Sequence, residues 1–463
     1  MTGPDRGLSY WTMMFRQRDF ALMLLSQFLA YSAIWTSNIA LLHVVYTAME
    51  SSLGPGLLLT AQFLPAFLLM PVASRVIGRY GPRRTVLAST MCSGTLALIM
   101  PFWSSTFPIA WFFAFYVLYS ASITMFIIAG LTLLPLLVGT PDLARANRLL
   151  LATPSMMMVL SGASFIAQSH IEFNRHSEFL VVAALFFGSA LVFSRVGKPD
   201  LGIHSTPART GEDALGSFCA GLRYLFRHPY LTQIFVIRMA LYIGVGGQVL
   251  LALYSEEFFG HGVSGTGLLY MARGLAMLLG AFGLAQLVFM SLPSRDAIAV
   301  GLAIFGLGYL LASALSGFGI AAVALLLGIG FLGEGLLKST TMALLHEHTP
   351  QHYMARVMAA EQGLSAVIQS AAALAIAACV VSDMPETVLL ASAATGGLLI
   401  SVSLIWFAIS RFSRARPRPH PDGEEPSARS RRLSGTYATQ QDGGFADSEE
   451  SSLILASQPV RWR

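Results

Sequence analysis

Charged residues are scarce in this sequence. Asp, Glu, Lys and Arg make up 11% of the 463 residues, whereas 55% are hydrophobic. About a quarter of a typical soluble domain is charged, so this composition excludes a soluble globular chain. The apolar residues form long unbroken runs, and a helix of about 20 such residues crosses a bilayer. The alternating segments of a β-barrel are missing, so the sequence predicts an all-α membrane protein.

Other absences narrow the function. The three cysteines, Cys92, Cys219 and Cys379, are scattered without the spacing of metal ligands. There is no phosphate-binding Gly-x-x-x-x-Gly-Lys-Ser/Thr loop, which argues against ATP hydrolysis, and no nucleophile elbow. Nucleic-acid motifs are also missing. We therefore expect no enzyme activity, no metal or other cofactor, and no nucleic-acid partner.

A basic hinge, residues 74–84 with the sequence SRVIGRYGPRR, lies between two long apolar runs. Its four arginines, Arg75, Arg79, Arg83 and Arg84, cannot lie in hydrocarbon. Short Arg-rich loops stay on the cytoplasmic side, so this segment predicts the orientation of every other loop. The alternation of basic inner loops and acidic outer loops then predicts a multi-pass protein of the inner (plasma) membrane with both termini in the cytosol.

Only twelve spans keep this alternation of charge. The spans form two groups of six separated by a polar stretch, and the Arg-Pro-rich and Ser/Gly/Gln/Glu-rich C-terminal tail cannot form a core. Its arginines Arg411, Arg414, Arg416 and Arg418 are candidates for contact with membrane lipids. The expected segments are a cytosolic N-terminus (1–20), a six-helix bundle (21–194), a cytosolic linker (195–230), a second six-helix bundle (231–410) and a disordered cytosolic tail (411–463).

The two groups of spans are related by an internal duplication. At an offset of 211 residues, Pro82 falls on Pro293 and Arg84 falls on Arg295, so the hinge itself is repeated. The same offset places Tyr31 on Tyr242. One offset that holds over several helices predicts two parallel repeats, the architecture of transporters whose halves move around a central site.

On these features the chain resembles the major facilitator superfamily, and within it the macrolide and enterobactin exporters of the drug/siderophore exporter-like branch. The likeness covers about residues 14–411 and depends on RQRDF before the first span, the hinge, TPDLARANRLL and HTPQHYMARVMA. In the family's hinge pattern, G-x-x-x-D-R-x-G-R-R, this chain matches at Arg79, Gly81 and Arg83. Gly78 stands where the family has the Asp of its charge-relay latch. The resemblance implies a gating role for Arg75, Arg79, Gly81, Arg83 and Arg84.

The repeat offset also aligns residues of the two halves that lie at equivalent depths in the membrane. Gln27 corresponds to Arg238, and Gln62 corresponds to Arg273, so the second half is cationic where the first is neutral. An arginine inside a span costs at least about 2.5–3.5 kcal/mol, which favours a position facing a wet cavity or a partner. The family resemblance implies that spans seven and ten line the cavity, so Arg238 and Glu334 could meet there. Glu334 is then either a proton-coupling carboxylate gated by Arg238 or half of a static ion pair.

Other polar residues complete the candidate site. Arg273, with no acidic residue in obvious register, is either an anchor for an anionic substrate or an arginine that reaches the headgroups. Trp35, Asn38 and Gln248 are candidates to line a cavity for an amphipathic ligand. Alternatively, they make packing contacts and hydrogen bonds between helices. The sequence LATPSMMMVLSGASF lacks the family's antiporter signature in span five.

These observations favour a secondary active transporter, a monomer that exports a small amphipathic or anionic molecule such as a siderophore in exchange for protons. Three alternatives stay open: a multidrug or macrolide efflux pump, a lysophospholipid translocator, and a non-transporting membrane sensor that signals through its tail.

Overall fold

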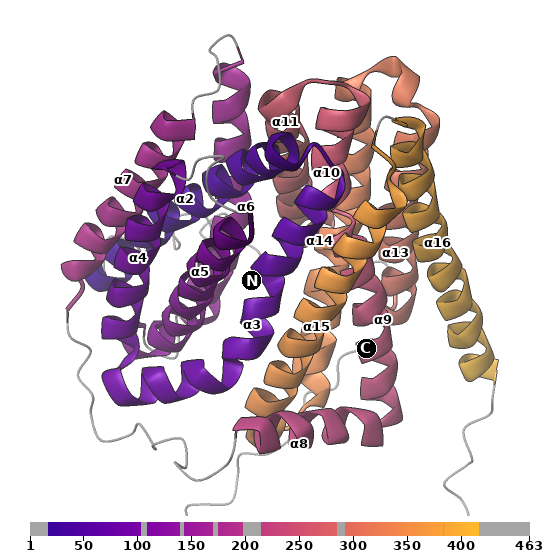
Figure 1. Ribbon diagram of the computed structural model, residues 1–463. Coiled ribbons are helices and arrows are strands. Elements are labelled where there is room, and N and C mark those ends of the chain that lie inside the picture. The colour runs from indigo at the N-terminus through magenta and orange to yellow at the C-terminus, as the bar shows by residue number, and fades with distance from the viewer. Residues whose placement is uncertain are drawn as a thin grey trace, which may run out of the picture. The chain divides into compact units, whose positions relative to one another are not determined.

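The computed structural model describes residues 17–102, 109–138, 143–169, 175–197, 214–284, 292–382 and 384–415, and within these ranges the chain is helical and has no strand (Figure 1). The predicted all-α membrane fold is confirmed. Much of the predicted tail, including Arg416 and Arg418, lies outside the described residues. α16 (Glu386–Ala415) continues through residues 411–415, where the tail was expected to begin.

Twelve helical segments of the described ranges correspond to the twelve spans. In nine of them a helix is long and apolar enough to cross a membrane by itself. The N-terminal half consists of α2 (Arg18–Met49), α3 (Leu53–Tyr80), α4 (Pro82–Ile99), α5 (Ile109–Leu137), α6 (Leu143–Ala167) and α7 (Arg175–Ser194). The C-terminal half consists of α9 (Pro229–Gly246) continued by α10 (Val249–Leu253) and η2 (Tyr254–Phe258), α11 (Gly262–Leu278) continued by η3 (Leu279–Leu284), α13 (Ser294–Ala314), α14 (Ile320–His348), α15 (Gln351–Cys379) and α16.

Two spans depart from a single apolar helix. In the seventh, α9 ends at Gly246, and the helix restarts at Val249 after Gly247 and Gln248. It then continues as π-helix over Tyr254–Phe258, a geometry that is rare and often found at functional sites. The apolar run of the eleventh span starts near residue 359, whereas α15 begins at Gln351. The longer helix places Glu361 well inside α15.

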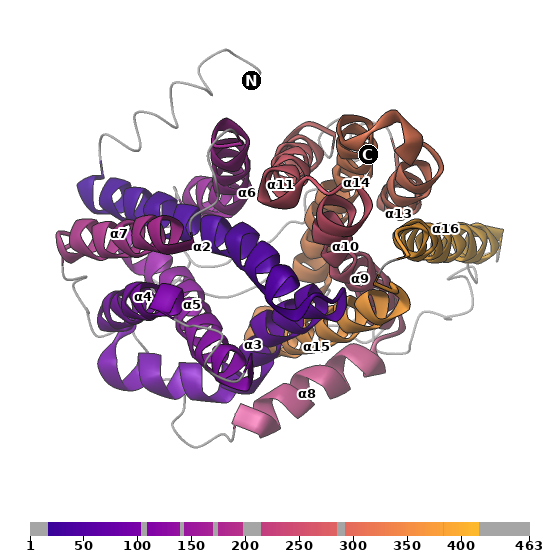
Figure 2. The same ribbon diagram turned by 45° about the horizontal axis from the view of Figure 1, so that its top comes forward.

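The two halves meet along two antiparallel helix pairs, α3 with α15 and α6 with α11 (Figure 2). Glycines allow the backbones to approach closely in both pairs. A Cβ on Gly162 would lie 2.4 Å from the carbonyl oxygen of Gly267, and a Cβ on Gly56 would lie 2.5 Å from the Cβ of Ala377. Small residues at such contacts are typical of helix packing in membranes.

Polar contacts also join the halves at one end of the helices. We call the end at which α3 leads into α4 the hinge end, and the opposite end the far end. At the far end His43 Nδ1 is 2.8 Å from Glu256 Oε1, and the Tyr46 hydroxyl donates to Glu257. Ser52 Oγ donates to the Val380 carbonyl at 2.7 Å. These contacts hold α2 and the start of α3 against the C-terminal half.

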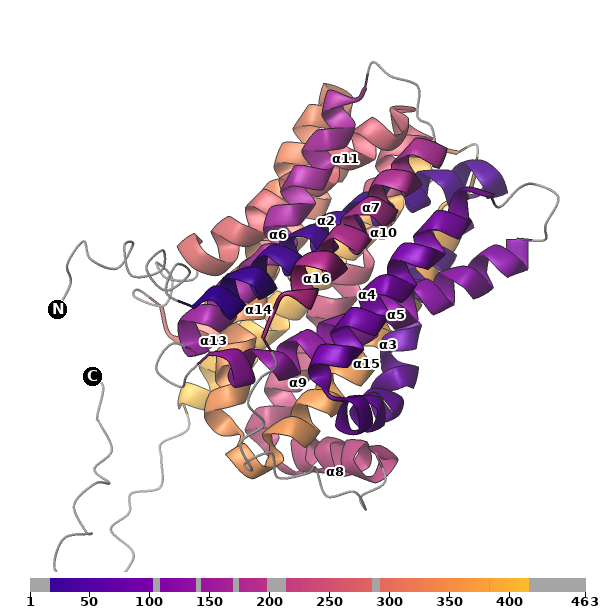
Figure 3. The ribbon, with the colours of Figure 1, turned by 90° about the vertical axis from the view of Figure 1, so that its left-hand side faces the viewer.

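The predicted linker contains a helix. α8 (Ala214–Arg227) lies across the ends of α9 and α15 at the hinge end (Figure 3). Its apolar side chains join a cluster that contains Leu225, Phe235 and Val357. The backbones touch as well, because a Cβ on Gly221 would lie 2.1 Å from the Arg356 carbonyl oxygen.

The hinge turns at Gly81, whose φ of 82° favours glycine. Immediately after it, Pro82 begins α4, a position that suits proline because the first helical N–H has no partner in the helix. Arg83 donates from Nη2 to the Ser194 carbonyl at 2.9 Å and from Nε to the Val196 carbonyl at 3.1 Å. It therefore satisfies free carbonyls at the end of α7, while Arg75, Arg79 and Arg84 are exposed.

Candidate functional site

A cluster of charged side chains is buried between α11 and α14. The Arg273 guanidinium makes a bidentate contact with the Glu334 carboxylate, with Nη2 3.0 Å from Oε1 and Nε 3.3 Å from Oε2. Lys338, one turn along α14, places Nζ 2.7 Å from the same Oε1. Gln248 accepts a hydrogen bond from Arg273 Nη1 through its Oε1. Arg273 is 3% exposed and Glu334 0%, so this ion pair is shielded from lipid and bulk water.

Local backbone features bring these residues together. The break after α9 places Gln248 at the start of α10, where it reaches Arg273. Further along the same pair of helices, a Cβ on Gly335 would lie 2.7 Å from the Met277 carbonyl oxygen, so α11 and α14 nearly touch. Because the backbones are close, little space is left for lipid or water between the Arg273 guanidinium and the Glu334 carboxylate. The two charges therefore compensate each other directly.

A second buried ion pair lies nearer the hinge end. Arg238 Nη2 is 2.7 Å from Glu361 Oε1, and its Nη1 donates to Thr341 Oγ1 at 2.8 Å. The Tyr242 hydroxyl accepts from Arg238 at 2.8 Å and donates to Glu361 Oε1 at 2.6 Å. The other oxygen, Glu361 Oε2, is buried and has no hydrogen-bond partner among the described residues.

α14 connects the two clusters. Glu334, Lys338 and Thr341 are spaced by four and three residues, so they lie on one face of the helix. The Lys338 side chain is 35% exposed although it lies inside a span, whereas Glu334 beside it is fully buried. A lysine at this depth avoids hydrocarbon, so its exposed part indicates a water-accessible space next to α14.

Trp35 of α2 faces this region from the N-terminal half. The Trp35 ring lies 5.9 Å from that of Tyr270, which is one turn from Arg273 on α11. Trp35 Nε1 and Gln27 Oε1 are buried and lack hydrogen-bond partners among the described residues. Asn38 is buried in α2, and Gln62 is half-buried in α3. Trp35 and Gln27 therefore offer one free donor and one free acceptor.

The expected pairing of Arg238 with Glu334 is wrong. Arg238 pairs with Glu361, and Glu334 pairs with Arg273 and Lys338. The expectation that Arg273 lacks an acidic neighbour is wrong for the same reason. Burial explains the outcome, because an unpaired guanidinium costs so much inside a membrane that each arginine takes the carboxylate nearest its own depth.

Sequence reasoning missed Glu361, Lys338, Tyr242 and Thr341 as members of the site. Glu361 seemed to lie at the mouth of the eleventh span, but α15 begins ten residues earlier, which places it about 15 Å inside the helix. The spacing of Glu334 and Lys338 was a usable signal, since a glutamate four residues before a lysine forms an ion pair on a helix.

The chain belongs to the Major Facilitator Superfamily, whose family model matches residues 23–373. Its fold is similar to that of the nucleoside transporter NupG, with a TM-score of 0.65, 12% identity, and coverage of 84% of this chain and 100% of that one. A POT peptide transporter has a TM-score of 0.69 at 14% identity, with 86% and 95% covered. A bacterial homologue of the human lysosomal transporter Spinster, solved inward-facing and unoccupied, has a TM-score of 0.65 at 14% identity, with 88% and 99% covered. No curated protein matches the sequence. The chain is thus a multi-pass membrane transporter.

Proposed function

We propose that this transporter is a proton-coupled exporter of a small amphipathic or anionic molecule, such as a siderophore. In this proposal it works by alternating access in the inner membrane, with the hinge end in the cytosol. The observation that carries the proposal is the Arg273–Glu334–Lys338 cluster. Its two cations and one carboxylate leave a net charge of +1 beside the contact of Trp35 and Tyr270 that joins the halves. A positive charge and two aromatic rings suit an anionic molecule with an apolar part.

The geometry supports a coupling step. The charged Glu334 carboxylate holds Arg273 and Lys338 side by side, so both cations can contact one anionic substrate. A proton on Glu334 weakens its hold on both cations and lets them separate, so the protonated cluster binds the substrate weakly. Substrate and proton therefore occupy the cluster in turn, as exchange requires, and the Trp35 N–H and Gln27 oxygen, which lack partners among the described residues, supply further hydrogen bonds. Glu334 is the proton-coupling residue in this scheme, and Arg238 holds Glu361 in the second cluster.

The hinge contributes the gating part of the proposal. Gly81 provides the turn between α3 and α4, and Arg83 ties α4 to the end of α7. A movement of the N-terminal half can therefore pass from α7 to α3 through this segment. Arg75, Arg79 and Arg84 keep the turn at the membrane surface.

A second candidate, efflux of cationic or macrolide-type compounds, is favoured by one observation. Glu361 Oε2 is a buried carboxylate oxygen with no partner among the described residues, and such an oxygen can accept a cation or a protonated amine. The two candidates differ in the cluster they use, so substrate charge decides between them.

The test uses purified full-length protein in liposomes that enclose a pH-sensitive dye. Iron-free siderophores, erythromycin and lysophosphatidylglycerol are added outside in separate runs. Entry of an exchanged substrate drives protons out, so a rise in internal pH with a siderophore supports the proposal. A rise only with erythromycin supports the second candidate, and transport of the lysolipid supports translocation. If nothing moves, or if a siderophore moves without a pH change, the proposal fails. A chain that lacks residues 418–463 must give the same flux, whereas a tail-signalling sensor would lose its activity.

A further inference from the structure

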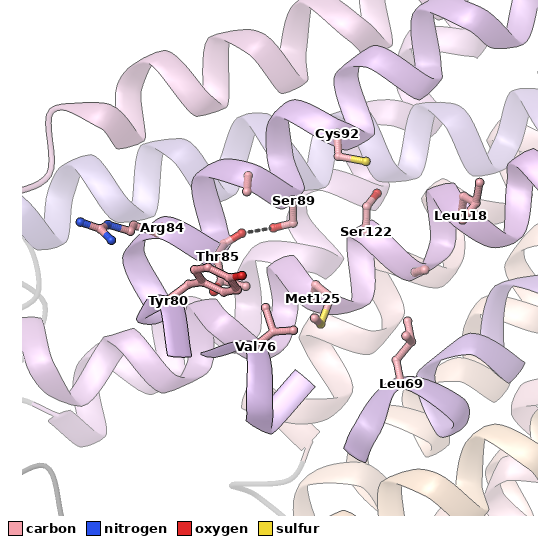
Figure 4. Close-up of a pocket in the computed structure, with 12 residues that line it drawn as sticks. Leu69, Val76, Tyr80, Arg84, Thr85, Ser89, Cys92, Leu118, Ser122 and Met125 are labelled. Carbon is pink, nitrogen blue, oxygen red and sulfur yellow. Dashed lines mark hydrogen bonds between the residues drawn. The ribbon is translucent and has the colours of Figure 1, made fainter. Parts of the chain in front are cut away.

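A cavity of about 500 Å³ lies within the N-terminal half, between α3, α4 and α5 and away from the charged clusters (Figure 4). Val76, Ala88, Leu118 and Met125 are among the side chains that line it. Arg84 lies at one end of the row of labelled side chains and Leu118 at the other. Leu118 and Ala88 are exposed although they lie in membrane-spanning helices, so the cavity opens toward lipid.

The threonine and serine hydroxyls that line the cavity are hydrogen-bonded. Thr85 Oγ1 donates to the Gly81 carbonyl at 2.9 Å, and Ser89 Oγ donates to the Thr85 carbonyl at 2.7 Å. Ser122 Oγ donates to the Tyr119 carbonyl at 2.8 Å. These hydroxyls are satisfied by their own helices, which leaves an apolar surface. Whatever enters the body of the cavity must itself be apolar.

The mouth of the cavity is cationic and aromatic. Arg84 is exposed, and the Arg79 guanidinium lies 5.5 Å from the ring centre of Tyr80. Tyr80 is 53% exposed, as in the aromatic belts at membrane surfaces. Arg84 and Cys92, both lining residues, are eight residues apart on α4, a rise of about 12 Å. One leaflet of a bilayer has about 15 Å of hydrocarbon, so the cavity runs from the headgroups through most of one leaflet.

We propose that this cavity binds one acyl chain of an anionic phospholipid from the leaflet at the hinge end, with the lipid phosphate at Arg84. Charge complementarity at the mouth selects an anionic headgroup, and the apolar walls select an alkyl chain. The site uses neither Arg–Glu cluster, so its test does not depend on the transported substrate, although Arg84 also belongs to the hinge. It lies against the bend between α3 and α4, so a bound chain packs against the hinge.

The headgroup is tested by native mass spectrometry of the full chain, titrated with phosphatidylglycerol or phosphatidylcholine of equal chain length. The expected result is tighter binding of phosphatidylglycerol and a loss of about fivefold in Arg84→Gln. The matched control is Arg195→Gln, an exposed arginine after the end of α7 that does not line the cavity. Equal binding of the two lipids, or equal loss in both variants, overturns the proposal. So does full competition by inorganic phosphate, which would show an ion site without a lipid chain.

The acyl chain is tested by filling the cavity. Ala88→Phe adds a ring at an exposed lining position and should reduce phosphatidylglycerol binding about tenfold without lowering the thermal midpoint. Ala110→Phe, at an exposed alanine of α5 that does not line the cavity, should leave binding unchanged. If Ala88→Phe binds phosphatidylglycerol as tightly as the wild type, the proposed lipid site is wrong. If that variant does not fold, Ala88→Leu, a smaller addition at the same position, takes its place and must still weaken binding.

Discussion

Lys338 and Arg273 contact the same oxygen atom of Glu334, at 2.7 Å and 3.0 Å. The two cations come from different helices, and only Lys338 is partly exposed. Glu334 therefore holds an accessible cation and an inaccessible one together at the centre of the C-terminal half. Any ligand that draws the Lys338 ammonium away from Glu334 also changes the balance of charge at Arg273.

Replacement of Glu334 by Gln should abolish coupling and spare substrate exchange, because the amide oxygen still accepts hydrogen bonds from both cations but the amide neither gains nor loses a proton. Uphill transport driven by an imposed pH gradient should fall at least about tenfold, with counterflow in the absence of a gradient retained. The measurement is uptake, into liposomes, of the compound that alters internal pH in the assay above. Glu347→Gln, at an exposed position near the hinge end of α14, is the control and should behave as wild type. A gradient-driven flux that persists in Glu334→Gln would make Glu334 structural.

Arg273→Gln should weaken the binding of an anionic substrate about 10- to 100-fold, which is the effect of losing one hydrogen bond to a charged group. Lys338→Gln should weaken binding by a similar factor, since both cations contact the bound anion in the proposed scheme. Substrate-induced thermal stabilisation at several concentrations gives the dissociation constants. Glutamine already occupies the repeat-related position Gln62, which makes it a suitable replacement. Unchanged affinity in both variants would remove the anion site.

The second ion pair should behave as a structural unit in which the single changes are worse than the double change. Arg238→Gln leaves Glu361 as a buried, unpaired carboxylate and should cost about 3–5 kcal/mol of unfolding free energy. The double variant Arg238→Gln/Glu361→Gln removes both charges and should recover most of this loss. Thermal or chemical unfolding in detergent measures both. Additive losses in the double variant would show that the two side chains do not stabilise each other.

The far-end contact between His43 and Glu256 should help to hold the halves together, because His43 Nδ1 lies 2.8 Å from Glu256 Oε1. Spin labels at the exposed positions Thr47 and Glu386 in a cysteine-free chain report the separation of the halves. Glu256→Gln removes the carboxylate and should shift the distribution toward longer distances than in the wild type. Equal distance distributions in the two chains would show that this contact does not keep the far end joined.

The packing of α8 should depend on Gly221. Gly221→Ala adds a Cβ about 2.1 Å from the Arg356 carbonyl oxygen, so the helix must move away. The expected loss is about 1–3 kcal/mol, typical of overpacking. Gly216→Ala, at an exposed position of the same helix, should be neutral or slightly stabilising, since alanine favours helix. Equal unfolding midpoints in the two variants would mean that α8 does not depend on this contact.

Much of the fold followed from the sequence, because hydrocarbon length and the cost of buried charge constrain membrane helices strongly. Gln248 and Arg273 were identified individually on that basis. Their partners were not, since pairing depends on helix rotation and on where helices begin. The start of α15 at Gln351 places Glu361 inside the helix, where it is fully buried, and Gln248 reaches Arg273 from the turn between α9 and α10. Neither feature has a period or a motif that a single sequence displays.

The backbone contact of α6 with α11 has a consequence for movement between the halves. Gly162, Gly267 and Gly274 let the backbones of the two helices approach closely, with Val159 and Met271 packed at the same contact. The glycines themselves have no side chain whose rotamer must change when the helices slide or tilt past each other. They therefore lower the resistance to movement at this contact. The polar bridges at the far end then determine how long the halves stay joined, and the α6–α11 contact determines how freely they turn once released.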